Sequence, residues 1–133
     1  MIRIGRVVAV DSLRAKVRVE IPDTDGVVSY WLPVLHKKTQ LDKYYHLPDI
    51  GELVVVVFLD YGVEEGFVLG AIYNDIDLPP EFDRNVAEIK FSDGTTVKYD
   101  KNTKKLYIHS VGDIEIVSDT HITLIAPKID LNP

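Results

Sequence analysis

The sequence predicts an all-β protein in two parts: a small barrel, and then a slender β-prism that three chains build together. Three observations carry this prediction. Strand signals follow one another closely up to residue 72, and no convincing helical pattern interrupts them. Residues 75–85 are rich in Asp and Pro and mark a change in composition. After them, apolar residues in pairs, with one residue between, recur every seven to nine positions to the end of the chain.

The first part holds five segments that we expect to be strands: residues 2–10, 15–21, 27–35, 53–59 and 67–72. Residues 15–21 alternate between apolar and charged side chains, as a strand does when one of its faces is in water. Turn residues at 22–26 and 60–62 separate the segments. Five short strands within about 75 residues are typical of a closed barrel of the OB type. Residues 36–48 would be the long loop between its third and fourth strands.

The stretch from 75 to 85 is expected to be a stiff, polar connector, because prolines and acidic residues dominate it. The predicted organisation is therefore a barrel domain at residues 1–74, a linker at 75–85 and a second domain at 86–133.

The second domain is built from a short repeat. Side chains two positions apart leave the same face of a strand, so each repeat supplies one short strand with two core residues. Turn residues separate the repeats at Asp93-Gly94, Asn102-Thr103, Gly112-Asp113 and Asp119-Thr120. The apolar pairs are Ile89/Phe91, Val97/Tyr99, Leu106/Ile108, Ile114/Ile116, Ile122/Leu124 and Ile129/Leu131.

A single chain has nothing with which to cover this row of apolar side chains, so we expect it to face copies of itself. The predicted assembly is a homotrimer that forms an intertwined β-helix or β-prism, with Glu115, Thr123 and Asp130 facing solvent. A second interpretation stays open: a meander packed against the first domain, since Asp93-Gly94 suits a hairpin turn. The predicted trimer core comprises Leu106, Ile108, Ile114, Ile116, Ile122, Leu124, Ile129 and Leu131.

The amino-acid composition of the chain argues against several classes of protein. The chain has 133 residues, a mass of 15.0 kDa, a net charge of −6 and no cysteine, so we expect neither disulfides nor thiolate metal sites. Residues 1–84 carry −5 of that charge and residues 85–133 carry −1, unlike the basic surface of a general nucleic-acid binder. The longest apolar run, 53–59, is too short for a membrane helix. Charged residues throughout positions 3–18 argue against a signal peptide, so we expect synthesis in the cytoplasm.

No catalytic constellation stands out, and the sequence predicts no enzyme and no cofactor. Asp60 with Glu64 and Glu65 is interpreted as a solvated turn, because adjacent strand residues point to opposite faces. Ser29, Ser92, Ser110 and Ser118 lack the sequence context of an activated nucleophile. His109 and His121 fall on the phase opposite Ile108 and Ile122, which favours surface histidines over metal ligands on an axis; the others are His36 and His46.

A rival hypothesis is an OB module that binds single-stranded nucleic acid. Stacking faces and positive charge for such a role could come from Tyr30, Trp31, Tyr44 and Tyr45 beside Lys37, Lys38 and Lys43. The acidic balance of the domain favours a packing role for Trp31 and a loop or subunit contact for Tyr44 and Tyr45.

The order of several short segments resembles a known family. The segments are Ile4-Gly5-Arg6-Val7-Val8, Val17-Arg18-Val19, Asp25-Gly26 leading to residues 29–35, Pro48 to Val55, and Gly66 to Asn74. Their order and spacing over residues 2–80 resemble the phage baseplate assembly protein V family, and the repeats extend the resemblance over nearly the whole chain.

The resemblance implies the trimeric central spike of a contractile tail, related to the spikes of type VI secretion. It implies an OB collar that docks on hub and tail tube proteins, and a needle that pierces the bacterial outer membrane when the sheath contracts. The protein would then belong to the virion, at the tail baseplate. A structural tail adaptor that pierces nothing is the alternative within this class.

One departure from the family concerns the far end of the chain. Members with their own apex commonly end in a His-x-His motif that holds a metal ion, whereas this chain ends at Leu131-Asn132-Pro133. The resemblance then implies either a shortened chain or a separate tip protein, such as a small cap of the PAAR type. That protein would contact Ile129, Leu131 and Pro133.

Overall fold

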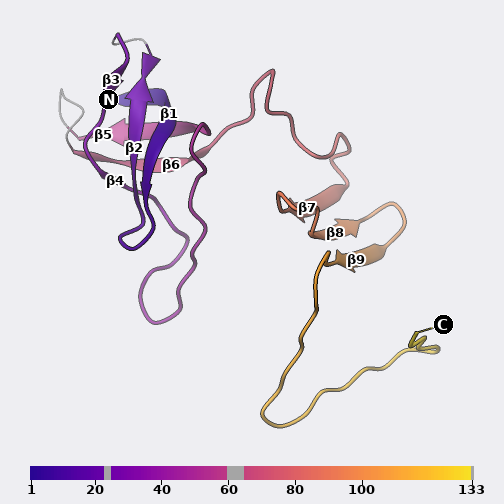
Figure 1. Cartoon of the computed structure of the whole chain (residues 1–133). Coiled ribbons are helices and arrows are strands. Elements are labelled where there is room, and N and C mark those ends of the chain that lie inside the picture. Colours follow the sequence, from indigo (N-terminus) through magenta and orange to yellow (C-terminus); the bar gives the residue numbers. More distant parts are fainter. Residues whose placement is uncertain (23–24, 60–64, 133) are drawn as a thin grey trace. The chain divides into compact units, whose positions relative to one another are not determined.

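The computed structural model describes residues 1–22, 25–59 and 65–132, and the chain divides into two compact units. Unit 1 is Met1–Pro79 and unit 2 is Pro80–Pro133 (Figure 1). All the elements with defined bounds are strands, and the described ranges contain no α-helix, so the all-β prediction is confirmed. The described residues accordingly include no helix that could cross a membrane. The domain limits at 74 and 86 stay a prediction.

The described residues of unit 1 contain six strands, and they account for the five predicted segments. The third segment is divided into two short strands. The strands are β1 (Ile2–Asp11), β2 (Lys16–Ile21), β3 (Val27–Val28), β4 (Leu32–Pro33), β5 (Leu53–Phe58) and β6 (Gly66–Ala71).

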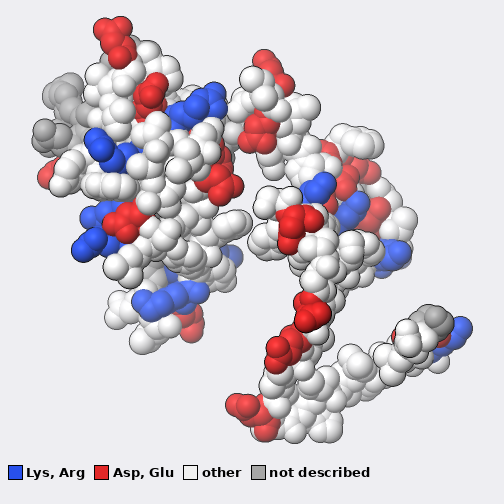
Figure 2. All heavy atoms as spheres, viewed as in Figure 1, with Lys and Arg blue, Asp and Glu red and all other residues white. Residues whose placement is uncertain are grey.

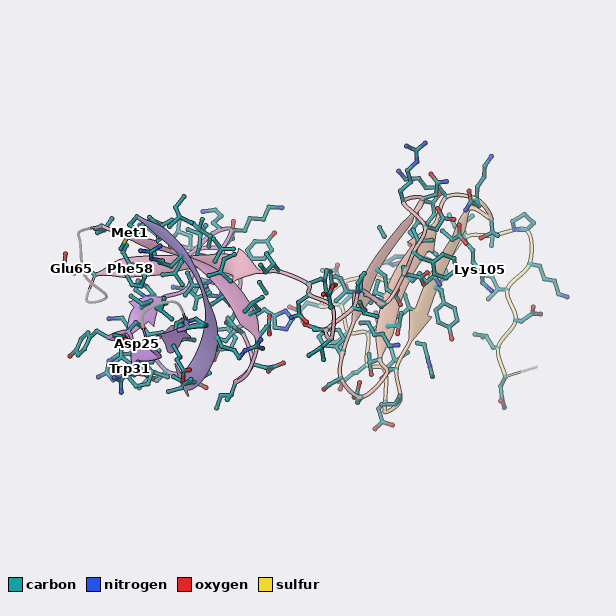
Figure 3. All side chains as sticks on the ribbon, turned by 90° about the horizontal axis from the view of Figure 1, so that it is seen from above. Met1, Asp25, Trp31, Phe58, Glu65 and Lys105 are labelled. Carbon is teal, nitrogen blue, oxygen red and sulfur yellow. The ribbon has the colours of Figure 1, made fainter. Side chains whose placement is uncertain are left out.

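These strands form one antiparallel sheet that curls until its ends meet. Its order is β3-β2-β1-β5-β6, and β4 also pairs with β2. A parallel bridge joins Val34 to Val68, and the N–H of Leu35 donates to the carbonyl oxygen of Val68 at 2.9 Å. Met1 and Phe58, both labelled in Figure 3, are joined by two backbone hydrogen bonds of 2.7 and 2.8 Å. The predicted small barrel therefore exists, and the segment after β4 closes it.

The core of the barrel comes from alternate positions along its strands. β2 and β5 each bury every second residue, while their other side chains are only half-buried. Full burial of an aliphatic or aromatic side chain stabilises a fold by about 1.5–3 kcal/mol. The buried apolar residues are Val7, Val17, Val19, Ile21, Leu32, Val54, Val56, Phe58 and Val68.

The break in the third strand corrects the prediction of one continuous strand over 27–35. The register of β2 against β3 differs by one residue from that of β2 against β4, so an extra residue is inserted between them. Ser29 lies in this gap and is fully buried. The N–H of Val19 donates to Ser29 Oγ at 2.9 Å, and the N–H of Ser29 donates to the carbonyl of Val19 at 2.7 Å. A side chain thus replaces one backbone acceptor of the ladder.

Residues 36–48 form a loop, as predicted, and hydrogen bonds hold its shape. The N–H of His46 donates to Nε2 of His36 at 3.3 Å, and the other ring nitrogen of His36 lies 3.0 Å from the carbonyl oxygen of Val34. Tyr45 stacks on His36 with ring centroids 6.4 Å apart, and its hydroxyl donates to the carbonyl of Ser12 at 2.8 Å.

Unit 2 holds a three-stranded antiparallel sheet of β7 (Val86–Lys90), β8 (Thr96–Asp100) and β9 (Lys105–His109), in that order. The two predicted turns connect them. Gly94 has a φ of 96°, and the N–H of Thr95 donates to Asp93 at 2.9 Å, a bond that lowers the pKa of Asp93. In the second turn Lys104 has a positive φ of 58°, and the N–H of Asn102 donates to Asp100 at 2.8 Å.

Beyond β9 the structure differs from the expected series of strands. No strand is present in residues 110–132, including the pairs Ile114/Ile116, Ile122/Leu124 and Ile129/Leu131. A strand exists only when its backbone groups pair with a neighbouring strand. The chain bends at Val111-Gly112 and at Asp119-Thr120, where Ser118 Oγ accepts from the N–H of Thr120. In the described part of a single chain, no neighbouring strand pairs with residues 110–132.

Gly5 offers a test of the barrel packing. A Cβ at this position would collide with Val19 and lie 2.7 Å from the carbonyl oxygen of Glu20. We predict that Gly5→Ala lowers the free energy of unfolding by roughly 1–3 kcal/mol, since overpacking a core forces neighbours apart. Urea titration of the full chain measures this change. In Gly70→Ala the added carbon has no atom within 4 Å, so this matched variant should unfold like the unaltered chain. Equal midpoints for the two variants would contradict the packing described.

Candidate functional site

The sheet of unit 2 has one apolar face. The strand register places Ala87, Tyr99 and Leu106 in one row across β7, β8 and β9. The next row of the same face holds Ile89, Val97 and Ile108. We call these six residues, together with Ile114, Ile116, Ile122, Leu124, Ile129 and Leu131, the apolar stripe.

The apolar stripe is in water. Leu106, Ile108 and the six later members are between 49% and 81% exposed. Within the described residues of unit 2, no second layer packs over this face. Contiguous exposed apolar surface of this kind marks a site of association, because its removal from water is favourable.

The structure brings together part of the predicted trimer core. Leu106 and Ile108 lie on β9 and share the apolar face with their neighbours on β7 and β8. The other six predicted residues lie on the extended segment after β9. Glu115, Thr123 and Asp130 are exposed as well, so one chain does not distinguish the predicted core phase from the predicted solvent phase. Figure 2 shows acidic side chains spaced along this segment, with uncharged atoms between them.

The opposite face of the sheet is polar. Apart from Val86, its members are polar; the rows are Val86, Asp100 and Lys105, then Glu88, Lys98 and Tyr107, then Lys90, Thr96 and His109. Lys98 Nζ donates to Glu81 at 2.6 Å, and this hydrogen bond raises the pKa of Lys98. Sequence reasoning missed this pair, because nothing in the local pattern connects residues 17 positions apart. Hydrated charges suit a face turned to solvent, so the apolar face is the one that needs a partner.

Three of the four aromatic residues of the rival nucleic-acid hypothesis have partners within the chain, whereas Tyr30 is 65% exposed. The guanidinium carbon of Arg18 lies 6.0 Å from the centre of the Trp31 ring, and Trp31 is half-buried. The ammonium of Lys37 lies 5.8 Å from the ring centre of Tyr44. One face of Tyr45 stacks on His36. On the face of unit 1 shown in Figure 2, basic and acidic side chains are intermixed.

The residues weighed for catalysis or metal binding are dispersed. Asp60 and Glu64 lie outside the described residues, while Glu65 is exposed. The hydroxyl of Ser29 accepts from the N–H of Val19 and donates to the carbonyl oxygen of Tyr30. In the described part of the chain, no group of three or more His, Cys, Asp and Glu residues is arranged to hold a metal ion.

The predicted contact for a tip protein is described in part. Ile129 and Leu131 are exposed, and Pro133 lies outside the described residues. Lys128 and Asp130, on either side of Ile129 in the sequence, approach each other to 3.7 Å. Such an exposed surface pair contributes about 0–1 kcal/mol, so it does little to fix the segment.

Comparison with known proteins identifies two similarities. Residues 3–73, more than half of the chain, match the family described as the type VI secretion system/phage-baseplate injector OB domain. The chain is also similar to the spike protein of Escherichia phage P2, with 25% identity over 129 residues. The match covers 97% of this chain and 60% of that protein. The resemblance expected from the sequence is thereby confirmed.

The phase of the apolar stripe can be tested with two adjacent residues. We predict that Ile116→Asp abolishes association of the chain, because it places like charges in a dry core at a cost of several kcal/mol per ion. Glu115→Lys, one position away, should change the free energy of unfolding by no more than about 0.5 kcal/mol, as surface substitutions do. Light scattering and thermal melting measure both effects. Equally harmless substitutions would mean that the phase is assigned wrongly.

Proposed function

The chain belongs to the family of type VI secretion system and phage-baseplate injector OB domains, and on that premise we propose that it is the central spike of a contractile phage tail or tail-like injection particle. The single observation that carries the proposal is the uncovered apolar stripe that follows an injector OB domain. The similarity to the phage P2 spike protein, which extends through nearly the whole chain, supports it.

The proposed active form is a homotrimer. Three copies of the apolar stripe would meet about one axis, with the polar face of each β7–β9 sheet turned to water. Each copy would supply the second layer that the others lack, and each would offer partners for unpaired strand edges. This arrangement is the trimeric intertwined β-helix or β-prism predicted for residues 86–133. The alternative, a meander packed against the first domain, would instead have unit 1 cover the apolar face.

The proposed activity is mechanical. Unit 1 would serve as the collar that docks on the baseplate hub and tail tube proteins. The prism would transmit the force of sheath contraction to a small area of the bacterial outer membrane. A close-packed interior with paired strands has low compressibility, which is the property that such a load requires. The protein would act in the virion, without catalysis and without a cofactor.

A separate tip protein is part of the proposal. Ile129 and Leu131 present apolar surface at the distal part of the stripe, and three copies would bring six such side chains together. A small cap of the PAAR type would cover them. Pro133 is a further proposed contact.

The mass of the protein in solution tests the trimer. We predict that multi-angle light scattering gives about three times the 15.0 kDa chain mass, because burial of the apolar stripe drives association. The melting temperature should rise with protein concentration. A monodisperse monomer at micromolar concentration would refute the proposed assembly.

The position of the protein in assembled particles tests the function. We predict that electron microscopy places it on the central axis beyond the tail tube, with additional density next to Ile129 and Leu131. A position off the axis would favour the adaptor that pierces nothing. An axial position without distal density would remove the tip protein and leave the spike.

A further inference from the structure

The loop between β4 and β5 carries charge and apolar surface that the proposed function has not used. Residues 36–48 contain three lysines and a single acidic residue, whereas residues 1–84 as a whole carry a charge of −5. The loop lies within unit 1, and Figure 1 shows it reaching beyond the turn between β1 and β2. We call five exposed residues the basic loop tip: Lys37, Lys38, Leu41, Lys43 and Tyr44.

The positive charges of the basic loop tip are held together by uncharged groups. Nζ of Lys38 and Nζ of Lys43 each donate to a backbone carbonyl oxygen of the loop at 3.0 Å. Nζ of Lys37 lies 5.8 Å from the ring centre of Tyr44. The ion pairs among the described residues involve none of these lysines. Three like charges without a carboxylate beside them repel one another, and an acidic partner would relieve this repulsion.

Leu41 stands at the loop tip in a backbone conformation that leucine rarely adopts. Its φ is 64°, in the left-handed region where glycine and asparagine are favoured. Its side chain is 89% exposed, so packing within the chain does not explain a leucine at this position. Backbone strain of this kind is concentrated at sites that bind a partner.

The loop is already shaped for binding. The N–H of Tyr44 donates to the carbonyl oxygen of Lys38 at 3.1 Å and closes the tip. At the base of the loop, the Tyr45 hydroxyl is bonded to Ser12 and the Tyr45 ring stacks on His36. A segment held in this way loses less conformational entropy when it binds.

We propose that the basic loop tip is the part of unit 1 that docks on the baseplate hub, and that it takes an acidic surface with an apolar recess. The inference rests on the proposed spike function and names the contact that the collar would use. Leu41 would enter the recess, and the three lysines would lie against carboxylates around its rim. An apolar centre with a polar rim is the usual anatomy of a protein interface.

The observations favour a protein over a nucleic acid or a membrane. Single-stranded nucleic acid binds by stacking its bases on aromatic rings, but here Lys37 lies over Tyr44 and His36 stacks on Tyr45. A phosphate backbone also offers no recess for Leu41. Segments that recognise anionic lipids carry clusters of about four to eight basic residues. The loop has fewer, and its apolar group is a single leucine.

Leu41→Gly separates a binding role from a structural one, because glycine accepts the positive φ and lacks the side chain. The full chain with this change should melt no lower than the unaltered chain and keep its oligomeric state. The fraction of assembled particles that contain it should fall about tenfold, as for an important interface residue. The matched control is Ile50→Gly, at a 69% exposed turn residue of the same unit, and its incorporation should be unchanged.

A pair of charge reversals tests the lysines. Lys38→Glu with Lys43→Glu should lower incorporation into particles to a similar extent, and added salt should weaken docking of the unaltered chain. The control pair Lys101→Glu with Lys104→Glu makes the same change of net charge in an exposed turn of unit 2, and it should have no effect. Equal effects of the two pairs would mean that only net charge matters, and would overturn the docking site.

Cross-linking in assembled particles identifies the partner. A photoreactive benzophenone amino acid at position 40, next to Leu41, should form an adduct with a hub peptide rich in Asp and Glu, identified by mass spectrometry. An adduct with nucleic acid, with lipid or with another copy of this chain would overturn the inference. So would the lack of any adduct in particles that contain the substituted chain.

The outcomes separate this inference from the function on which it rests. If the unaltered chain is not on the axis of the particle, the spike proposal itself fails. If it is on the axis but Leu41→Gly and the Lys38/Lys43 pair are both incorporated normally, the docking site is wrong and the spike proposal stands. A lower melting temperature for Leu41→Gly would show that the leucine serves the fold, and would also overturn the inference.

Discussion

The stability of both units depends on whether a second layer covers the apolar side of the sheet. A strand that alternates between apolar and polar residues gains stability only when the apolar side is removed from water. Unit 1 solves this within one chain, because its sheet curls and places β2, β4, β5 and β6 around a common interior. Unit 2 has only three strands and an extended segment, and its apolar side faces outward. The two units are built from the same local pattern and differ in where the second layer comes from.

Closure of the barrel rests on a few local irregularities. The bulge in β1 between Val7 and Ala9 and the bulge in β6 bend the sheet, and the inserted residue near Ser29 turns the third segment from the edge of β2 toward β6. Once it has turned, Val34 reaches Val68. β1 needs a glycine at position 5, since a Cβ there would collide with Val19 of β2. The barrel therefore depends on the local geometry at these few positions.

Sequence reasoning found what local alternation specifies and missed what long-range bonds specify. The strands of both units and the Asp93-Gly94 turn were predictable, because apolar periodicity and turn chemistry act between near neighbours. The break at Ser29 was not, since it depends on a serine hydroxyl that meets Val19 ten residues away. The Glu81–Lys98 bond was hidden for the same reason. Of the candidate site, the strand register confirms that Leu106 and Ile108 share one face, whereas burial of the stripe involves other chains and stays a prediction.

The recurrence of apolar pairs along the stripe determines how the stability of the proposed spike depends on its length. Each repeat contributes two apolar side chains, and each such side chain stabilises the assembly by about 1.5–3 kcal/mol when it is fully buried. Stability in a stacked array grows with the number of neighbouring repeats, since each repeat contacts only the next. Burial of the two apolar side chains of one repeat does not offset the entropy cost of ordering that repeat, which is about 1–2 kcal/mol for each backbone position. In the proposed spike, folding of the segment after β9 would therefore accompany association, so that the prism would form as a whole or not at all.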